Sequence, residues 1–421
     1  MRRKIAIVVI VMSIAVLAAS IWPGASRSLS ASASKGYIDV HTHLLGRGVP
    51  PSMRAGGGEV PQFADLFSYG PPRRGLPDGS FRKRPGGRSG ASETRQGKTD
   101  YDGAAASLIS RMDQYGVEKS IIMPPPMSPE NRDSSLASEL IRIAKKYPGR
   151  LYVGLGGSTL NSTIQEYKDK TVTDEVTAQF TAEANRLAGL GIKVFGEMTA
   201  LHFSLGEGHP FEEVSPDHPL FLLLADIAAR SNIPIDLHMT AIEADMPLPE
   251  RLKQNRANPA TIKENITAFE RLLTHNRSAK IVWQHIGRGE PGVSGSVVDL
   301  LRRLLNTHSN LYMAIAIPEQ KEGRPGHPAR AVDEKGTIRP EWKKLLEEFP
   351  DRFMIGTDQF SAKSELQGQL KNDASASWNF LSQLPADLAQ KISRDNAERV
   401  YFKEGKKISS NPTGRGQTGG A

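Results

Sequence analysis

Apolar and polar residues follow two alternating patterns along this chain. Short apolar runs, typical of buried strands, alternate with longer segments in which apolar residues recur every three or four positions, as on one face of a helix. The first pattern predicts strands at residues 36–41, 119–123, 150–155, 192–196, 233–238, 280–285, 310–315 and 352–357. The second predicts helices at residues 104–115, 134–146, 173–189, 218–231, 261–275, 296–307, 340–348, 374–383 and 386–401.

Eight strands separated by amphipathic helices predict a single α/β domain. A regular alternation of this kind builds parallel βαβ units, and at this length such units close into a (β/α)8 barrel of the TIM type. The predicted barrel covers residues 36–402, and no internal repeat is evident in it.

Three segments lack either pattern. Residues 46–100 contain 19 Gly and Pro residues in 55, which predicts a long irregular loop insert after the first strand, either a lid or a mobile segment. Residues 27–35 are rich in Ser and Ala and resemble a linker, and the tail 403–421 is rich in Gly, Ser and Lys, which predicts disorder.

The first 26 residues have the pattern of an export signal. Arg2, Arg3 and Lys4 precede an apolar run at residues 5–22, and small residues such as Ala25 follow it. We therefore expect an exported protein, periplasmic or extracellular. The same run is long enough to stay as an N-terminal membrane anchor, so both signal cleavage and anchoring stay open.

Composition and charge narrow the classes of partner. The net charge of +8 is concentrated in residues 1–35 (+5), 46–100 (+5) and 403–421 (+3), which leaves the predicted barrel body at about −5. A basic nucleic-acid-binding face on the barrel is therefore not supported, and a small-molecule substrate is the expected partner. The oligomeric state is not predictable from this pattern.

The chain contains no cysteine. This excludes disulfides, thiolate nucleophiles, thiolate-bound zinc and iron–sulfur clusters. Any bound metal must therefore be held by histidines and carboxylates.

Polar residues stand at the ends of several predicted strands. His41 and His43 are two residues apart, so their side chains lie on the same face of an extended strand. His238, His285 and Asp358 each end or follow an apolar run. In a (β/α)8 barrel the C-terminal strand ends carry the active site, so we expect these five side chains to meet there.

These residues resemble the amidohydrolase superfamily, specifically the amidohydrolase-related branch that contains aminocarboxymuconate-semialdehyde decarboxylase-like enzymes. The resemblance covers roughly residues 36–402. It is carried by the pattern His-x-His, His, His, Asp on strands 1, 5, 6 and 8, and by three motifs: Tyr37-Ile-Asp-Val-His-Thr-His, His285-Ile-Gly-Arg-Gly and Asp395-Asn-Ala-Glu-Arg-Val-Tyr-Phe.

The resemblance implies one divalent metal held by His41, His43, His238 and Asp358. Zinc accepts such a ligand set readily, and manganese or iron would also fit. It also implies two catalytic residues. Asp358 would accept a proton from water on the metal, and His285 would stabilise charge on the attacked oxygen.

Glu197 opens an alternative to the single-metal site. It ends the run Ile192-Lys-Val-Phe-Gly-Glu, where some relatives place a carboxylate that bridges two metals. If Glu197 bridges, a second metal is expected, and His285 becomes its ligand instead of an acid or base. A solvated or capping glutamate is the other interpretation of this residue.

Several polar residues near the strand ends have two interpretations. Arg47 and Arg288 could meet a substrate carboxylate, or they could be solvated. His202, His209 and His218 fall in the loop after the fourth strand, where they could contact a substrate or lie on the surface.

Three functions are consistent with this sequence. The first is a hydrolase that activates water on a divalent metal to cleave a C–N or C–O bond in an amide, cyclic amide, ester or lactone. The second is a non-oxidative decarboxylase, and the third is a non-catalytic binding protein that the metal stabilises. The predicted export favours the hydrolase.

Overall fold

The computed structural model describes residues 36–46, 99–204, 210–288, 297–318, 329–364 and 374–403. The predicted export signal, the linker and the tail from residue 404 lie outside these ranges, and so does the insert except at its two ends. They stay predictions. Within the described residues no helix is long and apolar enough to cross a membrane.

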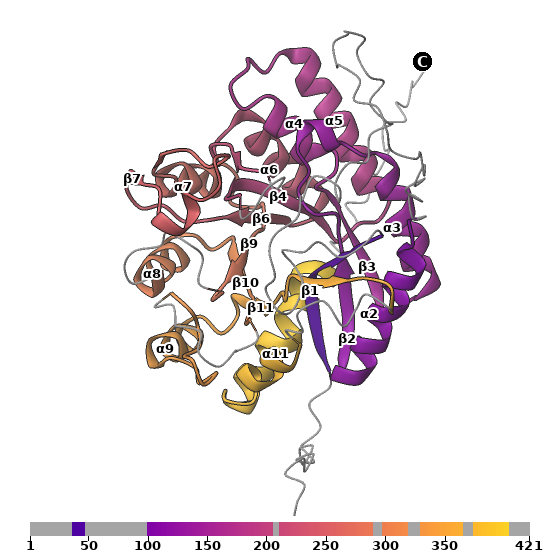
Figure 1. Ribbon diagram of the computed structural model, residues 1–421, viewed down its shortest axis with the longest axis vertical. Coiled ribbons are helices and arrows are strands. Elements are labelled where there is room, and N and C mark those ends of the chain that lie inside the picture. Colours follow the sequence, from indigo (N-terminus) through magenta and orange to yellow (C-terminus); the bar gives the residue numbers. More distant parts are fainter. Residues whose placement is uncertain are drawn as a thin grey trace, which may run out of the picture. The chain divides into compact units, whose positions relative to one another are not determined.

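Eight parallel strands form a closed barrel (Figure 1). They are β1 (Tyr37–Leu44), β2 (Val117–Ile122), β3 (Leu151–Gly156), β4 (Val194–His202), β6 (Ile235–Met239), β9 (Ile281–Ile286), β10 (Leu311–Ile315) and β11 (Phe353–Ile355). Each strand pairs with the next, and the pairing of β11 with β1, where Ile355 lies opposite Asp39, closes the ring. The prediction of a (β/α)8 barrel is confirmed.

Helices follow the strands and cover the outside of the barrel (Figure 1). They are α2 (Tyr101–Tyr115), α3 (Ser135–Lys146), α5 (Asp174–Gly189), α6 (Pro219–Ser231), α7 (Ile266–His275), α8 (Val297–Thr307), α9 (Pro340–Glu348), α11 (Ala374–Leu381) and α12 (Ala386–Gln390), which continues as π-helical turns at Lys391–Asp395 and Glu398–Phe402. Capping residues set some ends. The Asp100 carboxylate accepts from the Gly103 amide at the start of α2, and Gly116, with φ 64°, ends that helix.

Smaller elements lie in the connections between the barrel strands and the helices, and they were not predicted. They are α4 (Leu160–Glu166), β5 (Glu212–Glu213), β7 (Met246–Pro247), β8 (Thr261–Ile262), β12 (Gln359–Ser361) and the 3-10 turns Pro129–Asn131 and Glu250–Leu252. β7 and β8 pair as a two-stranded ribbon. The helix predicted at 261–275 is therefore wrong in its first turn, because residues 261 and 262 belong to that ribbon and α7 begins at Ile266.

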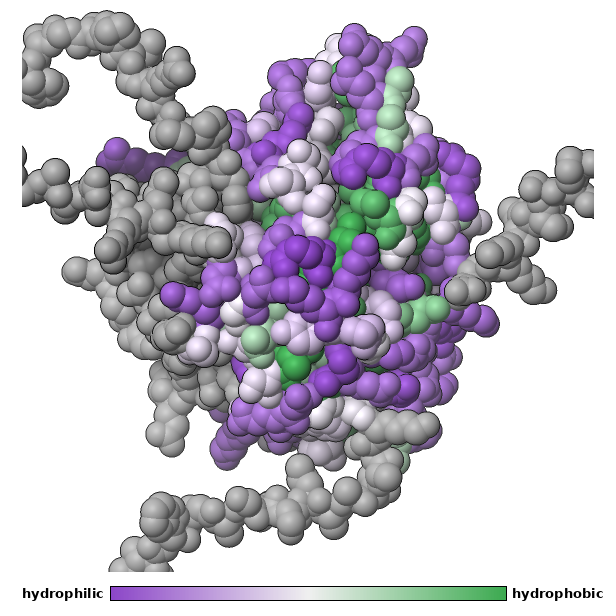
Figure 2. All heavy atoms as spheres, turned by 90° about the vertical axis from the view of Figure 1, so that its right-hand side faces the viewer, coloured by the Kyte–Doolittle hydropathy of each residue, from purple (hydrophilic) through white to green (hydrophobic). Residues whose placement is uncertain are grey.

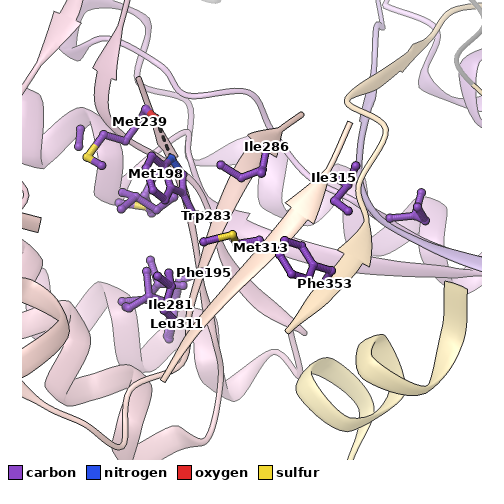
Figure 3. Close-up of a cluster of buried hydrophobic side chains, with 14 of the residues drawn as sticks. Phe195, Met198, Met239, Ile281, Trp283, Ile286, Leu311, Met313, Ile315 and Phe353 are labelled. Carbon is purple, nitrogen blue, oxygen red and sulfur yellow. Dashed lines mark hydrogen bonds between the residues drawn. The ribbon is translucent and has the colours of Figure 1, made fainter. Parts of the chain in front are cut away.

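The core has two parts on either side of the barrel wall. Inside the barrel, apolar side chains from six strands pack with the last helical turns, namely Ile38, Val40, Ile121, Val194, Val282, Ala314, Met354, Val400 and Tyr401. The larger part lies between the strands and the surrounding helices. Figure 3 shows a section of this outer core, in which Trp283 of β9 lies near Met198 and Met239. The interior cluster fills one end of the barrel and leaves polar strand ends at the other.

Replacement of Trp283 by Ala should lower the free energy of unfolding by about 3–5 kcal/mol. Trp283 is 2% exposed, packs edge-on against Phe269 with ring centroids 5.1 Å apart, and donates to the Met239 carbonyl at 2.7 Å. The variant loses apolar burial and leaves that carbonyl without its donor. Chemical denaturation measures the change.

The matched control is Leu190→Ala. The described surface in Figure 2 is mainly polar, with apolar residues between charged ones. Leu190, 45% exposed, is the exposed large hydrophobic side chain among the described residues. Its truncation should change stability by no more than about 0.5 kcal/mol. An equal effect of the two substitutions would contradict the assignment of Trp283 to the core.

Candidate metal centre

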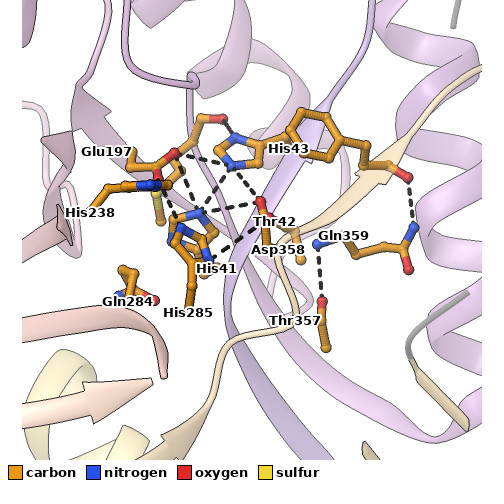
Figure 4. Close-up of polar contacts among 12 residues, drawn as sticks. His41, Thr42, His43, Glu197, His238, Gln284, His285, Thr357, Asp358 and Gln359 are labelled. Carbon is orange, nitrogen blue, oxygen red and sulfur yellow. Dashed lines mark hydrogen bonds and ion pairs between the residues drawn. The ribbon is translucent and has the colours of Figure 1, made fainter. Parts of the chain in front are cut away.

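Six polar side chains meet at the C-terminal end of the barrel (Figure 4). His41 and His43 come from β1, Glu197 from β4, His238 from β6 and His285 from β9, and Asp358 lies in the turn between β11 and β12. Because all eight strands are parallel, their C-terminal ends lie on one rim and bring these residues together. The five residues predicted from the sequence are therefore neighbours, and Glu197 lies among them.

A first group of donor atoms is formed by His41, His43, Asp358 and Glu197. The two Nε2 atoms of His41 and His43 are 3.0 Å apart. Asp358 Oδ1 lies 3.4 Å from His43 Nε2 and 3.9 Å from His41 Nε2. Glu197 Oε2 lies 3.4 Å from His43 Nε2 and 3.6 Å from His41 Nε2. Both carboxylates therefore lie within 4 Å of the two Nε2 atoms.

A second group uses the other oxygen of Glu197. Oε1 lies 2.8 Å from His238 Nδ1 and 3.0 Å from His285 Nε2. The rings of His238 and His285 pack against each other with centroids 4.5 Å apart. His238 therefore contacts Oε1 of Glu197, whereas His41 and His43 lie near Oε2, and Glu197 joins the two groups.

Buried acceptors orient both histidines of β1. His41 Nδ1 lies 3.0 Å from Asp236 Oδ2, which also accepts from Gln284 Nε2 at 2.6 Å. His43 Nδ1 lies 3.0 Å from the Met123 carbonyl. A donor role of each Nδ1 in these contacts leaves the lone pair of each Nε2 directed into the cluster, which is the arrangement that metal-ligating histidines adopt.

The turn that carries Asp358 is attached to β1. The Asp39 carboxylate accepts from the Thr357 hydroxyl at 2.6 Å and from the Thr357 amide at 3.0 Å. The Asp358 amide donates to the His41 carbonyl at 3.0 Å. Asp358 and His285 both have positive φ, 55° and 60°, which few residues other than glycine adopt, and such strain is often found at functional sites.

The charges of the cluster favour a cation. Burial lowers the pKa of His41, but the charges of Asp236 and Glu197 outweigh burial and hold that pKa well above its usual value. Burial likewise raises the pKa of Glu197, yet His41, together with hydrogen bonds from His238 and His285, holds it well below its usual value. The carboxylates around His41 and Glu197 therefore favour a positive charge within the cluster.

The donor set fits a divalent metal. Two atoms bound at about 2.1 Å to one tetrahedral zinc lie roughly 3.4 Å apart, close to the separations in the first group. Two overlapping sets of donor atoms, His41 with His43 and Asp358, and His41 with Glu197 and His285, each lie within 4.8 Å of one another. All are nitrogen or carboxylate oxygen, which suits zinc, manganese or iron.

The other polar residues considered in the sequence do not all lie at the centre. Arg288 contacts Asp358 Oδ2 through its guanidinium group. His202 lies against His238 with ring centroids 4.8 Å apart. His218 caps α6, where its Nδ1 accepts from the Leu220 amide, so its role is structural. Arg47 and His209 lie outside the described residues.

Two residues near the centre were not predicted. Asp236 precedes His238 by two positions in β6, so its side chain lies on the same strand face, and this spacing could have revealed it. Glu212 comes from the two-residue strand β5, for which the sequence has no periodic signal.

Comparison with known proteins identifies one family. A family model described as amidohydrolase matches residues 171–403, which include Glu197, His238, His285 and Asp358. No curated protein matches the chain.

Solved structures with similar folds share little sequence with this chain. A probable 2-pyrone-4,6-dicarboxylic acid hydrolase from Acinetobacter baumannii is 16% identical, with 87% of this chain and 99% of that one covered and a TM-score of 0.43. A 2,6-dihydroxybenzoate decarboxylase from Rhizobium is 15% identical with the same coverage and TM-score. A dihydroxybenzoic acid decarboxylase from Polaromonas sp. JS666, solved with bound manganese, is 14% identical, with 87% and 97% covered and a TM-score of 0.43.

Proposed function

We propose that this chain, which belongs to the amidohydrolase family, is a metal-dependent hydrolase that cleaves a C–N or C–O bond of a small molecule. The observation that carries the proposal is the position of Glu197 at the C-terminal end of the barrel, where Oε2 faces His41 and His43 and Oε1 faces His238 and His285. Amides, cyclic amides, esters and lactones are the substrate classes that this chemistry serves.

The proposed centre would hold two divalent ions. His41, His43, Asp358 and Glu197 Oε2 would hold one, and Glu197 Oε1, His238 and His285 would hold the other. When bound, such ions lower the pKa of water and polarise a substrate carbonyl. This arrangement takes the alternative in which Glu197 bridges, and it makes His285 a ligand. Zinc is the proposed metal, with manganese or iron as alternatives.

Asp358 is the residue best placed to handle a proton. Burial raises its pKa, but the charge of Arg288, followed by those of His285 and His43, holds the pKa far below its usual value. Asp358 is therefore ionised in the resting site, and its Oδ1 and Oδ2 atoms face different partners. Asp358 would accept a hydrogen bond from water and receive its proton as the water adds to the substrate.

Removal of metal should abolish turnover. The purified full-length chain is analysed for metal and assayed on chromogenic amides, lactones and esters before and after dipicolinate treatment. We expect about two equivalents of metal, at least about a hundredfold loss of activity on chelation, and recovery on addition of zinc or manganese. Bound metal without turnover on any substrate would favour a metal-stabilised binding protein, and a chain without metal after reconstitution would refute the proposal.

A decarboxylase is the second candidate, and Arg288 is the observation that favours it. A guanidinium next to the centre could bind the carboxylate that such a reaction removes. Arg288 is already paired with Asp358, however, so the hydrolase remains the preferred function. Release of CO₂ from carboxylated aromatic substrates, with no cleavage of the amide and ester panel, would reverse that order.

A further inference from the structure

Glu212 faces the metal centre from a short ribbon at the rim. β5 pairs antiparallel with the end of β4, and Glu212 lies opposite His202 in that pairing. Residues directly opposite each other in an antiparallel pair have their side chains on the same face. The His202 ring packs against His238 on this face. The Glu212 side chain is therefore on the side of the ribbon that borders the centre.

The Glu212 carboxyl is buried and makes no hydrogen bond of ordinary distance and angle with any described residue. Its exposed fraction is 4%, and both Oε1 and Oε2 lack such a bond. Asn161 and Thr199 lie beside it, but outside ordinary hydrogen-bond geometry. Asn161 Oδ1 accepts from the Thr199 amide, and Nδ2 donates to the Met127 carbonyl. Burial of a carboxyl without hydrogen bonds is unfavourable in free energy, so such a residue indicates a ligand that would bond to it.

The charges around Glu212 indicate the charge of that ligand. Burial raises the pKa of Glu212 to about 7, and the charge of Glu197 also raises it, while His238 and the contacts with Asn161 and Thr199 lower it. No arginine or lysine of the described chain forms an ion pair with Glu212. The residue therefore lacks a cation, and a positively charged hydrogen-bond donor would be its strongest partner.

We propose that Glu212 is a specificity-determining residue that binds an ammonium group of the substrate beside the metal centre. The substrate class is then a small amine-bearing amide, ester or lactone. That this ligand is a substrate rests on the proposed hydrolase function. Amine binding itself can be measured without turnover. Thr199 offers a second contact, because its buried hydroxyl lies beside Glu212 and makes no hydrogen bond of ordinary geometry with any described residue.

The test compares an amine with a neutral probe of similar shape. Binding of benzylamine and benzyl alcohol to the zinc-loaded full-length chain is measured by ligand-observed NMR. We expect the wild type to bind benzylamine at least about tenfold more tightly than benzyl alcohol. Glu212→Gln should remove this preference and leave the metal content unchanged. Glu213→Gln is the matched control, because Glu213 is the next residue of β5 and pairs with Leu201 on the other face.

A second variant separates ligand binding from a structural role. Glu212→Leu should also remove the preference while its melting temperature stays equal to or above that of the wild type, because it removes a buried carboxyl without partners. A preference that persists in Glu212→Gln, an absence of preference in the wild type, or metal loss in Glu212→Gln would overturn the proposal. Amine preference without turnover of any substrate would instead count against the hydrolase function alone.

Discussion

Replacement of Glu197 by Gln is expected to lower the bound metal from about two equivalents per chain to one or fewer and to reduce kcat/KM by about a thousandfold or more. Glu197 places Oε2 against His41 and His43 and Oε1 against His238 and His285. Gln has one neutral oxygen and one NH₂ group, so it can serve only one of the two groups. It also removes the negative charge that both groups share.

Elemental analysis and steady-state kinetics on the same preparation measure both effects. Glu213→Gln removes a carboxylate at a half-buried position outside the donor groups, and it should keep the wild-type metal content and rate. Circular dichroism shows whether the Glu197 variant is folded. A folded variant with two equivalents of metal and wild-type kcat/KM would mean that Glu197 does not join the two groups.

The barrel was predictable because its signals are local. Each strand is a short apolar run, and each helix has an apolar face that recurs with the helical period, so the sequence identifies them one by one. The first turn of the helix predicted at 261–275 was wrong because Thr261 and Ile262 pair with Met246 and Pro247, a contact between separate segments that periodicity does not report. β4 extends to His202, past its predicted end at residue 196, because polar residues at the rim break the apolar pattern.

The site was predictable where it depends on strand ends. His41, His43, His285 and Asp358 lie together as the parallel strands require. The sequence could not decide on which side of Glu197 the imidazole of His238 lies, because that depends on how β4 and β6 are registered. Glu212 was missed for a similar reason. Its place opposite His202 comes from a two-residue strand that exists only through pairing with β4.

Asp358→Asn should reduce kcat by about 10²- to 10⁴-fold while most of the metal stays bound. The amide keeps the shape of the carboxylate and one oxygen near His43, and His41, His43 and Glu197 still offer their donor atoms to the first ion. The amide cannot accept the proton that Asp358 would receive from water. It also removes the negative partner of Arg288.

Kinetics and elemental analysis again separate the two effects, and Asp299→Asn is the control. Asp299 is an exposed carboxylate on α8 whose partner is Arg302, so its loss should leave kcat and metal content unchanged. A large fall in kcat with metal retained supports a proton-transfer role for Asp358, since a group that only held the metal would lose ion and rate together. Equal loss of metal and activity would make Asp358 a ligand alone. Full activity in Asp358→Asn would place the chemistry elsewhere in the barrel.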